Sequence, residues 1–435
     1  MIPSAPRPAE VLQRLLRFDT TNPPGNERDC LLYAQSLLAE AGVESELHGI
    51  DDARPNLVAR VRGSGRAAPL LLYGHVDVVT TVNQDWTHPP FAGEEAAGFI
   101  WGRGALDMKG GVAMMLCALL RAAAEPDALP GDVVIALLSD EEDGGAFGAR
   151  YLVQHQARLF DGVKYAIGEL GGFTNHLGDR RLYPIMVAEK QAVWLRATVT
   201  GPGGHASTPL RGGSMARLAR MLAILDRRRL PVHITEAATL QIEGVAKALP
   251  FAGRTLLRRL LNPALTDLVL DRMGPQARLF DSILHNTATP TILRGGEKLN
   301  VIPSQLVVDI DCRILPGQQP ADAVRELGRL LGPDVLIEVV GHIPGPQRLD
   351  MALFDLLAQI LREADPGCHP IPMMLPGMTD AAHISTLGIQ TYGFLPMKLP
   401  PGIDFTRTIH AADERVPVAG IEFGTAAIHQ ALIRR

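Results

Sequence analysis

Cysteine is scarce in this sequence, with 4 residues in 435. No two of them form a C-x-x-C pair, so the chain offers no thiolate metal site of the zinc-finger kind. Three of the four lie in apolar or strand-like contexts, where a free thiol behaves as a small hydrophobic side chain. We therefore expect reduced, structural thiols at Cys30, Cys117, Cys312 and Cys368.

Long hydrophobic runs and an excess of basic charge are also absent. Lys and Arg number 42 against 47 Asp and Glu, which gives a net charge of −5, and the basic residues are scattered along the chain. The sequence therefore indicates no basic surface that would bind the phosphates of a nucleic acid. We find neither a secretory leader nor a bilayer-spanning run, so we expect a cytoplasmic protein that binds neither nucleic acid nor membrane.

Three common motifs of hydrolases and nucleotide-binding enzymes are missing. The sequence contains no H-E-x-x-H of a single-zinc protease, no G-x-S-x-G of an α/β-hydrolase and no G-x-x-x-x-G-K-[ST] phosphate loop. These absences disfavour the three corresponding mechanisms.

Length and composition indicate two domains, or one domain with a large insertion. A chain of 435 residues exceeds what one core usually organises, and 46% hydrophobic with 20% charged residues is an ordinary globular balance. The first 190 residues alternate helical and strand-like patterns, as in a layered α/β domain with a mostly parallel sheet. We predict helices at 9–18, 27–41 and 108–124, and strands at 56–61, 69–73, 132–138 and 163–167.

The pattern changes at residue 192, where an alternating strand begins an inserted α+β domain. The order of its elements, β-α-β-β-α-β, is that of a ferredoxin-like fold. We predict its strands at 192–201, 291–293, 305–313 and 335–340 and its helices at 214–227 and 321–331. The inserted domain is predicted at 191–342, and the first domain is predicted to be discontinuous, with residues 1–190 and 343–435 and a last helix at 419–433.

An extra segment at about 231–290 interrupts the inserted domain. It contains RTLLRRLLNPALTDLVLDRM, whose pattern is that of an amphipathic helix. A helix on a membrane surface or on a partner is the alternative to one packed on the inserted domain. We expect the packed helix.

Polar residues follow the predicted buried strands at their carboxyl ends, where open α/β sheets gather their ligand sites. His75 and Asp77 follow the strand at 69–73, and this spacing lets the carboxylate accept one imidazole N–H and fix the tautomer for a metal. Glu169 follows the strand at 163–167. Each residue alone is a weak signal, because loop histidines and acids are usually solvated or structural.

The run LLSDEEDGG places four acids behind the strand at 132–138. Glu141 and Glu142 are adjacent at the strand exit, so they point in different directions and can divide metal ligation from proton transfer. For Asp140 and Asp143 we expect a turn that faces solvent.

Asp107 and His410 complete a candidate ligand set. Taken alone, Asp107 is interpreted as the N-cap of the helix at 108–124, and His410 as a structural histidine. Together with the residues above they give nitrogen and carboxylate ligands without thiols, which suit zinc and leave room for water. A carboxylate can bridge two such ions. The candidate ligands are His75, Asp107, Glu142, Glu169 and His410.

With these residues in place, the sequence resembles the M20 metallopeptidase family, the di-zinc hydrolases that include acetylornithine deacetylase, succinyl-diaminopimelate desuccinylase, carboxypeptidase G2 and aminoacylase-1. The similarity covers nearly the whole chain and keeps the family's order. The motifs that carry it are LLYGHVDVV, GFIWGRGALDMKGG, LLSDEEDGG, GELGG, VTGPGGHAS, EKLNVIPSQLVVDIDCRI, GMTDAA and TIHAADERV.

The resemblance implies a di-zinc catalytic domain and an inserted lid and dimerisation domain. Asp107 would bridge two zinc ions, His75 and Glu169 would complete one site, and Glu142 and His410 would complete the other. Cobalt or manganese would fit the same ligands. A non-proline cis peptide bond would follow Asp107.

The resemblance also implies roles for residues outside the ligand set. Asp77 would support a ligand from behind, and Glu141 would be the general base that takes a proton from water and passes it to the departing amine. His205 of the lid would stabilise an oxyanion in the partner protomer's site. Asn300 and Arg313 would grip the substrate, their alternatives being a turn asparagine and a surface arginine.

We therefore expect a zinc-dependent amidohydrolase or metallopeptidase that acts as a homodimer. Its substrate would be an N-acyl amino acid or a short peptide with a free carboxylate. A dipeptidase or aminopeptidase of the same family, which recognises a free amine, is the first alternative. A catalytically inactive binding protein is the second.

Overall fold

A computed structural model describes residues 6–346 and 348–435. Its described residues fall into two compact units. The first holds residues up to 188 together with 349–373 and 379–435, and the second holds the residues between 189 and 348 together with 374–378. The boundaries predicted from sequence lie at 190/191 and 342/343.

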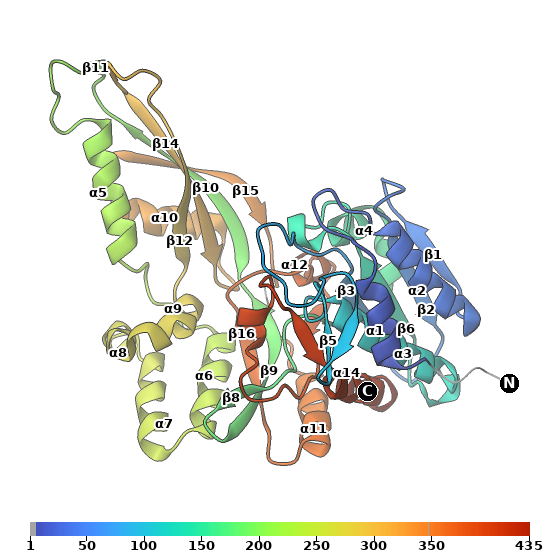
Figure 1. Ribbon diagram of the computed structural model, residues 1–435. Coiled ribbons are helices and arrows are strands. Elements are labelled where there is room, and N and C mark those ends of the chain that lie inside the picture. The colour runs from blue at the N-terminus through green and yellow to red at the C-terminus, as the bar shows by residue number, and fades with distance from the viewer. Residues whose placement is uncertain (1–5, 347) are drawn as a thin grey trace. The chain divides into compact units, whose positions relative to one another are not determined.

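The first unit is built on a mixed sheet with the strand order β1-β2-β6-β3-β7-β17-β9-β16, and β8 pairs with β9. Figure 1 labels β1, β2, β3, β6, β8, β9 and β16 of this sheet. Its four central strands, β6, β3, β7 and β17, are parallel, while β2 and β9 join them antiparallel. The predicted layered α/β domain is confirmed. The strands are β1 (Ser45–His48), β2 (Asn56–Val61), β3 (Leu70–His75), β6 (Val133–Leu138), β7 (Tyr165–Gly168), β8 (Asn175–Leu177), β9 (Arg180–Glu189), β16 (His369–Leu375) and β17 (Gln390–Gly393), and a separate small sheet holds β4 (Glu94–Ala96), β5 (Phe99–Trp101) and β18 (Arg415–Pro417).

The helices of the first unit cover this sheet around one buried helix, α3 (Lys109–Ala123). Residues 109–120 of α3 are buried without interruption, because the helix is apolar all round and packs against β3, β6, α1 and α14. Its glycines allow close approach, since a Cβ on Gly110 would lie 2.1 Å from the carbonyl oxygen of Ala105. The other helices are α1 (Pro8–Leu16), α2 (Arg28–Glu40), α4 (Ala149–His155), α11 (Phe354–Ala364), α12 (Ala381–Ser385), α13 (Phe405–Thr408) and α14 (Val418–Arg434), with short 3-10 turns η1 (Pro126–Ala128), η2 (Glu141–Asp143) and η3 (Ala157–Phe160).

The second unit holds an antiparallel sheet with the strand order β12-β14-β10-β15 and the helices α5 and α10. On β10, Val193, Leu195, Ala197 and Val199 are fully buried, while Trp194 between them is 40% exposed. This alternation is that of a sheet covered on one face, and the predicted ferredoxin-like order is confirmed. The elements are β10 (Gln191–Thr200), α5 (Ser214–Arg227), β12 (Thr287–Arg294), β14 (Gln305–Ile314), α10 (Pro320–Leu331), β15 (Val335–Ile343) and the ribbon of β11 (Gly204–His205) with β13 (Val301–Ile302).

The extra segment at about 231–290 forms several short helices instead of one long amphipathic helix. Proline and asparagine break the pattern, at Pro250 before α7 and at Asn262 and Pro263 before α8. The Lys190 ammonium donates to the carbonyl oxygen of His285, 2.9 Å away, which ties the end of this segment to the start of β10. The helices are α6 (Glu236–Ala248), α7 (Phe251–Arg258), α8 (Thr266–Met273) and α9 (Arg278–Leu284), with the turns η4 (Arg259–Leu261) and η5 (Gly274–Ala277).

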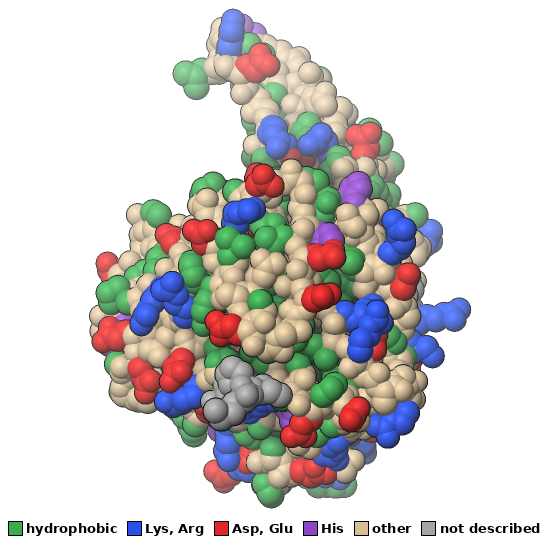
Figure 2. Space-filling view, turned by 90° about the vertical axis from the view of Figure 1, so that its right-hand side faces the viewer, with side chains coloured by type: hydrophobic (Ala, Val, Ile, Leu, Met, Phe, Trp, Pro, Cys, Tyr) green, Lys and Arg blue, Asp and Glu red, His purple; other side chains and the backbone are tan. Residues whose placement is uncertain are grey.

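Three further findings concern the cysteines, the length of the helices and the surface charge. The four cysteines are free and buried, as predicted. Of the helices described, none is long and apolar enough to cross a membrane. On the face shown in Figure 2, Lys and Arg side chains are interspersed with Asp and Glu and form no continuous basic stripe.

Candidate metal centre

Three neighbouring parallel strands deliver candidate ligands to one edge of the central sheet. His75 is the last residue of β3, Glu141 and Glu142 follow β6 in the turn η2, and Glu169 follows β7 directly. Since β6, β3 and β7 lie side by side and run in the same direction, their carboxyl ends meet.

The first cluster joins His75, Asp107 and Glu169, all of them buried. His75 Nε2 lies 3.3 Å from Asp107 Oδ1 and 3.5 Å from Glu169 Oε2. One nitrogen and two carboxylate oxygens thus face a common point, which is a ligand set that zinc accepts.

The second cluster joins His410, Asp107 and Glu142. His410 Nε2 lies 3.2 Å from Asp107 Oδ2 and 3.3 Å from Glu142 Oε2. Asp107 therefore turns one carboxylate oxygen towards each histidine. Its position between two clusters is the arrangement that a carboxylate shared by two ions requires.

The tautomer of His75 follows from its second ring nitrogen. His75 Nδ1 lies 3.0 Å from the main-chain oxygen of Asp77, which can only accept, so Nδ1 carries the proton and Nε2 is free to ligate. The Asp77 carboxylate is farther from the ring, at 3.5 Å. It is occupied instead by the backbone N–H groups of Glu141 and Glu142, each 3.1 Å away. Asp77 thus shapes the turn that carries two candidate residues.

Glu141 stands beside both clusters and belongs to neither. Its Oε2 lies 4.0 Å from His75 Nε2. Burial, followed by the charge of Glu169, raises the pKa of the Glu141 carboxyl well above its usual value. Cations held by the neighbouring clusters would oppose this rise and keep the carboxylate available as a base.

The charges and unpaired atoms of the two clusters fit metal cations. The clusters hold three carboxylates and two histidines, so they carry an excess of negative charge. The hydrogen bonds of His410 with Asp107 and then Glu142 raise the pKa of this histidine to about 10. Among the residues described, Glu142 Oε1 and Glu169 Oε1 are buried without a hydrogen-bond partner. A buried carboxylate oxygen without a partner is costly, and a metal ion would satisfy it.

The backbone around the clusters adopts uncommon conformations. Asp140, Leu170 and His410 have positive φ angles of 70°, 61° and 61° although none is glycine. Such residues cluster at functional sites, where the surrounding structure holds them in place. The peptide bond between Asp107 and Met108 is cis, as the resemblance implies.

The expectation that Asp140 faces solvent is wrong. Asp140 is 1% exposed, and its carboxylate lies 2.9 Å from the Arg54 guanidinium and accepts the backbone N–H of Phe147. Arg54 also pairs with buried Glu27 at 2.8 Å. One cation thus compensates two buried carboxylates behind the acidic turn. Its positive charge also offsets the repulsion among the four adjacent acids at 140–143.

We expect Arg54→Met to destabilise the protein by about 3 to 5 kcal/mol, because the substitution leaves Glu27 and Asp140 buried without a cation. Urea unfolding at neutral pH measures the change. Arg62→Met is the matched control: Arg62 also pairs with an aspartate, Asp132 at 2.8 Å, but its side chain is 80% exposed. Its loss should cost at most about 1 kcal/mol. Equal midpoints for the two variants would contradict this account.

Sequence reasoning missed a second support behind the clusters. Glu414 is fully buried, and its carboxylate accepts the backbone N–H groups of Gly104, Leu106 and Asp107. Arg103, 1% exposed, pairs with it at 2.7 Å. The sequence indicated this role of Glu414 only through its nearness to a candidate ligand, because it stands four residues after His410 within TIHAADERV.

The candidate lid residues lie in the second unit. His205 is exposed at the end of β11, and its Nδ1 lies 2.6 Å from Ser207 Oγ. Asn300 is exposed just before β13. Arg313, on β14, makes two hydrogen bonds to Asp311 within the same strand, at 2.7 and 3.0 Å. These three residues are thus placed on the ribbon and the sheet of that unit.

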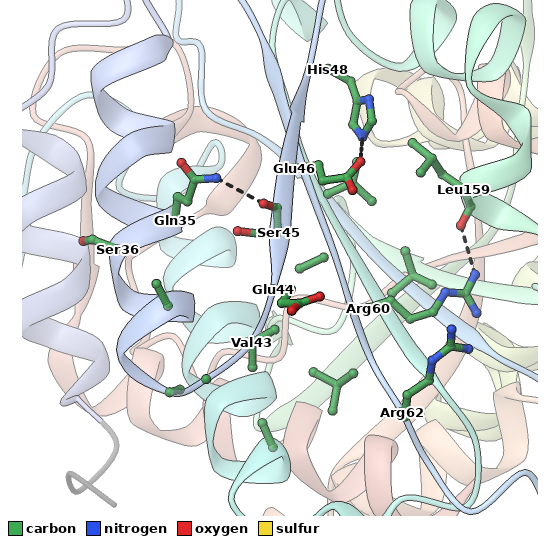
Figure 3. Close-up of a pocket in the computed structure, with 18 of the residues that line it drawn as sticks. Gln35, Ser36, Val43, Glu44, Ser45, Glu46, His48, Arg60, Arg62 and Leu159 are labelled. Carbon is green, nitrogen blue, oxygen red and sulfur yellow. Dashed lines mark hydrogen bonds and ion pairs between the residues drawn. The ribbon is translucent and has the colours of Figure 1, made fainter.

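A groove of about 1410 Å³ runs along the edge strand β1 of the first unit, lined by α2, β2 and η3 (Figure 3). None of the candidate ligands lines it. Among its polar groups, Gln35 donates to the oxygen of Ser45 and Arg60 to the oxygen of Leu159. The side chains that could hold a metal converge at the two clusters, so we place the candidate site there and not in this groove.

Comparison with known proteins agrees with this geometry. The model of the peptidase family M20/M25/M40 matches residues 71–434. The chain belongs to this family. Like its relatives in the M20 family it is a hydrolase of the metallopeptidase type, and the family is metal-dependent.

Two curated relatives and one solved structure show how far the similarity extends. The human "N-fatty-acyl-amino acid synthase/hydrolase PM20D1" is 30% identical over 369 residues, which cover 81% of this chain and 71% of that protein. The "Succinyl-diaminopimelate desuccinylase" of Paracoccus denitrificans is 33% identical over 279 residues, covering 62% and 71%. The structure of the M20 family metallo-carboxypeptidase Sso-CP2 from Sulfolobus solfataricus has a TM-score of 0.69 at 16% identity, covering 98% and 99% of the two chains, and shows the same fold.

Proposed function

We propose that this protein is a di-zinc hydrolase that cleaves the amide bond of an N-acyl amino acid or of a short peptide with a free carboxylate. The observation that carries the proposal is the position of Asp107, which presents Oδ1 to His75 and Oδ2 to His410. His75 and Glu169 would hold one ion with it, and Glu142 and His410 the other. Cobalt or manganese would suit the same ligands.

The bound ions would polarise the amide carbonyl and lower the pKa of the attacking water. The proton chemistry falls to Glu141, whose Oε2 lies 4.0 Å from His75 Nε2 and which belongs to neither cluster. Its carboxylate accepts a proton from the water as the water attacks, and then delivers it to the nitrogen of the departing amine. Asp77 positions this base by holding the backbone N–H of Glu141 and that of its neighbour Glu142.

The substrate class is supported by the relatives and by the lid residues. One relative is named for N-fatty-acyl amino acids and another for a succinylated amino acid, and both substrates carry an acylated nitrogen and a carboxylate. Arg313 would bind that carboxylate after exchanging its bond with Asp311, and Asn300 would assist it. His205 would stabilise the oxyanion across a homodimer. We place the protein in the cytoplasm.

Hydrolysis of paired substrates tests the proposal. Each pair holds one dipeptide with a free carboxylate, once N-acetylated and once with a free amine, and each is assayed with zinc and with a chelator. We expect turnover of the acylated member that stops on chelation and returns with zinc. Turnover of the free-amine member alone would make the protein a dipeptidase or aminopeptidase, and no turnover by a zinc-loaded protein would make it a binding protein.

A further inference from the structure

Two of the three ligands of the second cluster, Asp107 and His410, lie on loops and not directly after a strand of the central sheet. Glu142 follows β6 in a short turn, whereas Asp107 ends the loop before α3 and His410 lies between α13 and β18. His410 also adopts a positive φ of 61°. A ligand on an irregular loop keeps its position only if other groups fix the loop.

The loop of Asp107 is held by Glu414. Glu414 Oε1 accepts the backbone N–H of Leu106 at 2.8 Å and that of Asp107 at 3.1 Å, and Oε2 accepts the N–H of Gly104 at 3.1 Å. Both carboxylate oxygens of this fully buried residue thus form hydrogen bonds to this one loop, and one of them also binds Arg103. A charged acceptor makes stronger bonds to N–H groups than a neutral one does.

The loop of His410 is held by Arg103 and Gln84. Gln84 Nε2 donates to the main-chain oxygen of His410 at 2.8 Å, and the Arg103 guanidinium donates to the oxygens of His410 and Ala411 at 3.3 and 3.1 Å. Arg103 also donates to Gln84 Oε1 at 2.7 Å and to Glu414 Oε2 at 2.7 Å. The three side chains therefore form one connected group that joins both loops.

We propose that Gln84, Arg103 and Glu414 act as a clamp that sets the separation of Asp107 and His410 and thereby the affinity of the chain for its second metal ion. This inference rests on the proposed two-metal function. The three are positioning residues: they contact the backbone of the ligands and reach neither metal nor substrate. The contacts also assign different parts to them. Among the described residues, Gln84 forms hydrogen bonds with His410 and Arg103, while Glu414 holds the backbone of Asp107, whose carboxylate both clusters share.

Zinc affinity, measured on the full chain by titration against a buffering chelator, tests the clamp. For Gln84→Ala we expect one of two zinc equivalents to weaken by roughly tenfold and the other to keep its affinity. For Glu414→Gln we expect both equivalents to weaken, by roughly 10 to 100-fold, the range typical of groups that support ligands from behind. Absorption bands of cobalt-loaded protein provide a readout of ligand geometry that needs no activity. His410→Ala, which lacks one ligand of the second cluster, identifies the weakened equivalent.

Glu422→Gln is the matched control. It removes the carboxylate from another Glu–Arg pair of the same unit, with Arg121 at 3.8 Å, which is partly exposed and touches neither loop. Both equivalents should then bind as in the unaltered protein.

The outcomes of these titrations distinguish a failure of the clamp from a failure of the proposed function. Unchanged affinity of both equivalents in Gln84→Ala, or an equal fall of both, overturns it. If Glu414→Gln does not fold, Gln84→Ala decides alone, because that substitution leaves the Arg103–Glu414 pair intact. An unaltered protein that binds no zinc refutes the proposed function, which is a separate outcome from two bound ions that the variants do not disturb.

Discussion

Glu141→Gln should lower kcat for amide hydrolysis by about 10² to 10⁴-fold while the protein retains its metal. The amide has nearly the shape of the carboxylate but cannot take a proton from water, and general acid–base catalysis contributes on this order. Because Glu141 lies outside both clusters, metal content should stay at two equivalents. Steady-state kinetics and metal analysis of the same preparation measure both quantities.

Asp143→Asn is the control for this prediction. Asp143 belongs to the same turn, η2, and carries the same charge, but its side chain is exposed and is not part of either cluster. Its kcat should not change. A metal-loaded Glu141→Gln variant with more than about a tenth of the original kcat would show that another group is the base.

Removal of the metals should abolish hydrolysis and also destabilise the first unit. Each ion at a concentration about a thousand times its Kd stabilises the folded state by about 4 kcal/mol, because it binds the folded chain and not the unfolded one. Without the ions, Glu142 Oε1 and Glu169 Oε1 are buried and have no hydrogen-bond partner among the described residues. We expect Tm in a thermal scan to fall by several degrees after dialysis against a chelator and to recover with zinc.

The variant Asp107→Asn provides the control for metal removal. It weakens the ligand shared by the two clusters, so its Tm should respond little to the chelator. Identical Tm values for the chelated and zinc-loaded forms of the unaltered protein would contradict the proposed role of these carboxylates.

The candidate ligands could be selected from the sequence because residues of ligand type stand directly after predicted buried strands or in the loops near them. His75 and Glu169 stand at the ends of apolar runs, and parallel strands place such ends at one edge of a sheet. Asp107 alone indicated only an N-cap, and it joined the candidate set because the other ligand types were present. These signals are local, so a single sequence contains them.

The supports behind the ligands could not be predicted, because they join residues far apart in the chain. Nothing near Asp107 shows that Glu414 accepts its N–H, and nothing near Asp140 shows that Arg54 pairs with it. Asp140 was expected in solvent since acids in turns usually are. Only the fold brings the compensating cation to it.

Strands that contain proline were missed or predicted too short, as β9 and β12 illustrate. Pro184 lies within β9, and no strand was predicted there. Pro290 lies within β12, where only residues 291–293 were expected. β12 is an edge strand with a register shift next to Pro290, the setting in which a sheet tolerates proline. The pattern of a single strand does not reveal whether it lies at an edge.

The place of β17 in the sheet affects the order in which the protein can assemble during synthesis. β17 lies between β7 and β9, and α14 packs on α3, yet both are translated after the whole of residues 189–348. Domains fold largely as they leave the ribosome, the earlier ones first. Residues 189–348, which make up nearly all of the second unit, can therefore fold while the first unit still lacks a middle strand and His410. A nascent chain at that stage has only part of its candidate metal ligands, so we expect hydrolytic activity only after the last stretch of the polypeptide has joined the sheet.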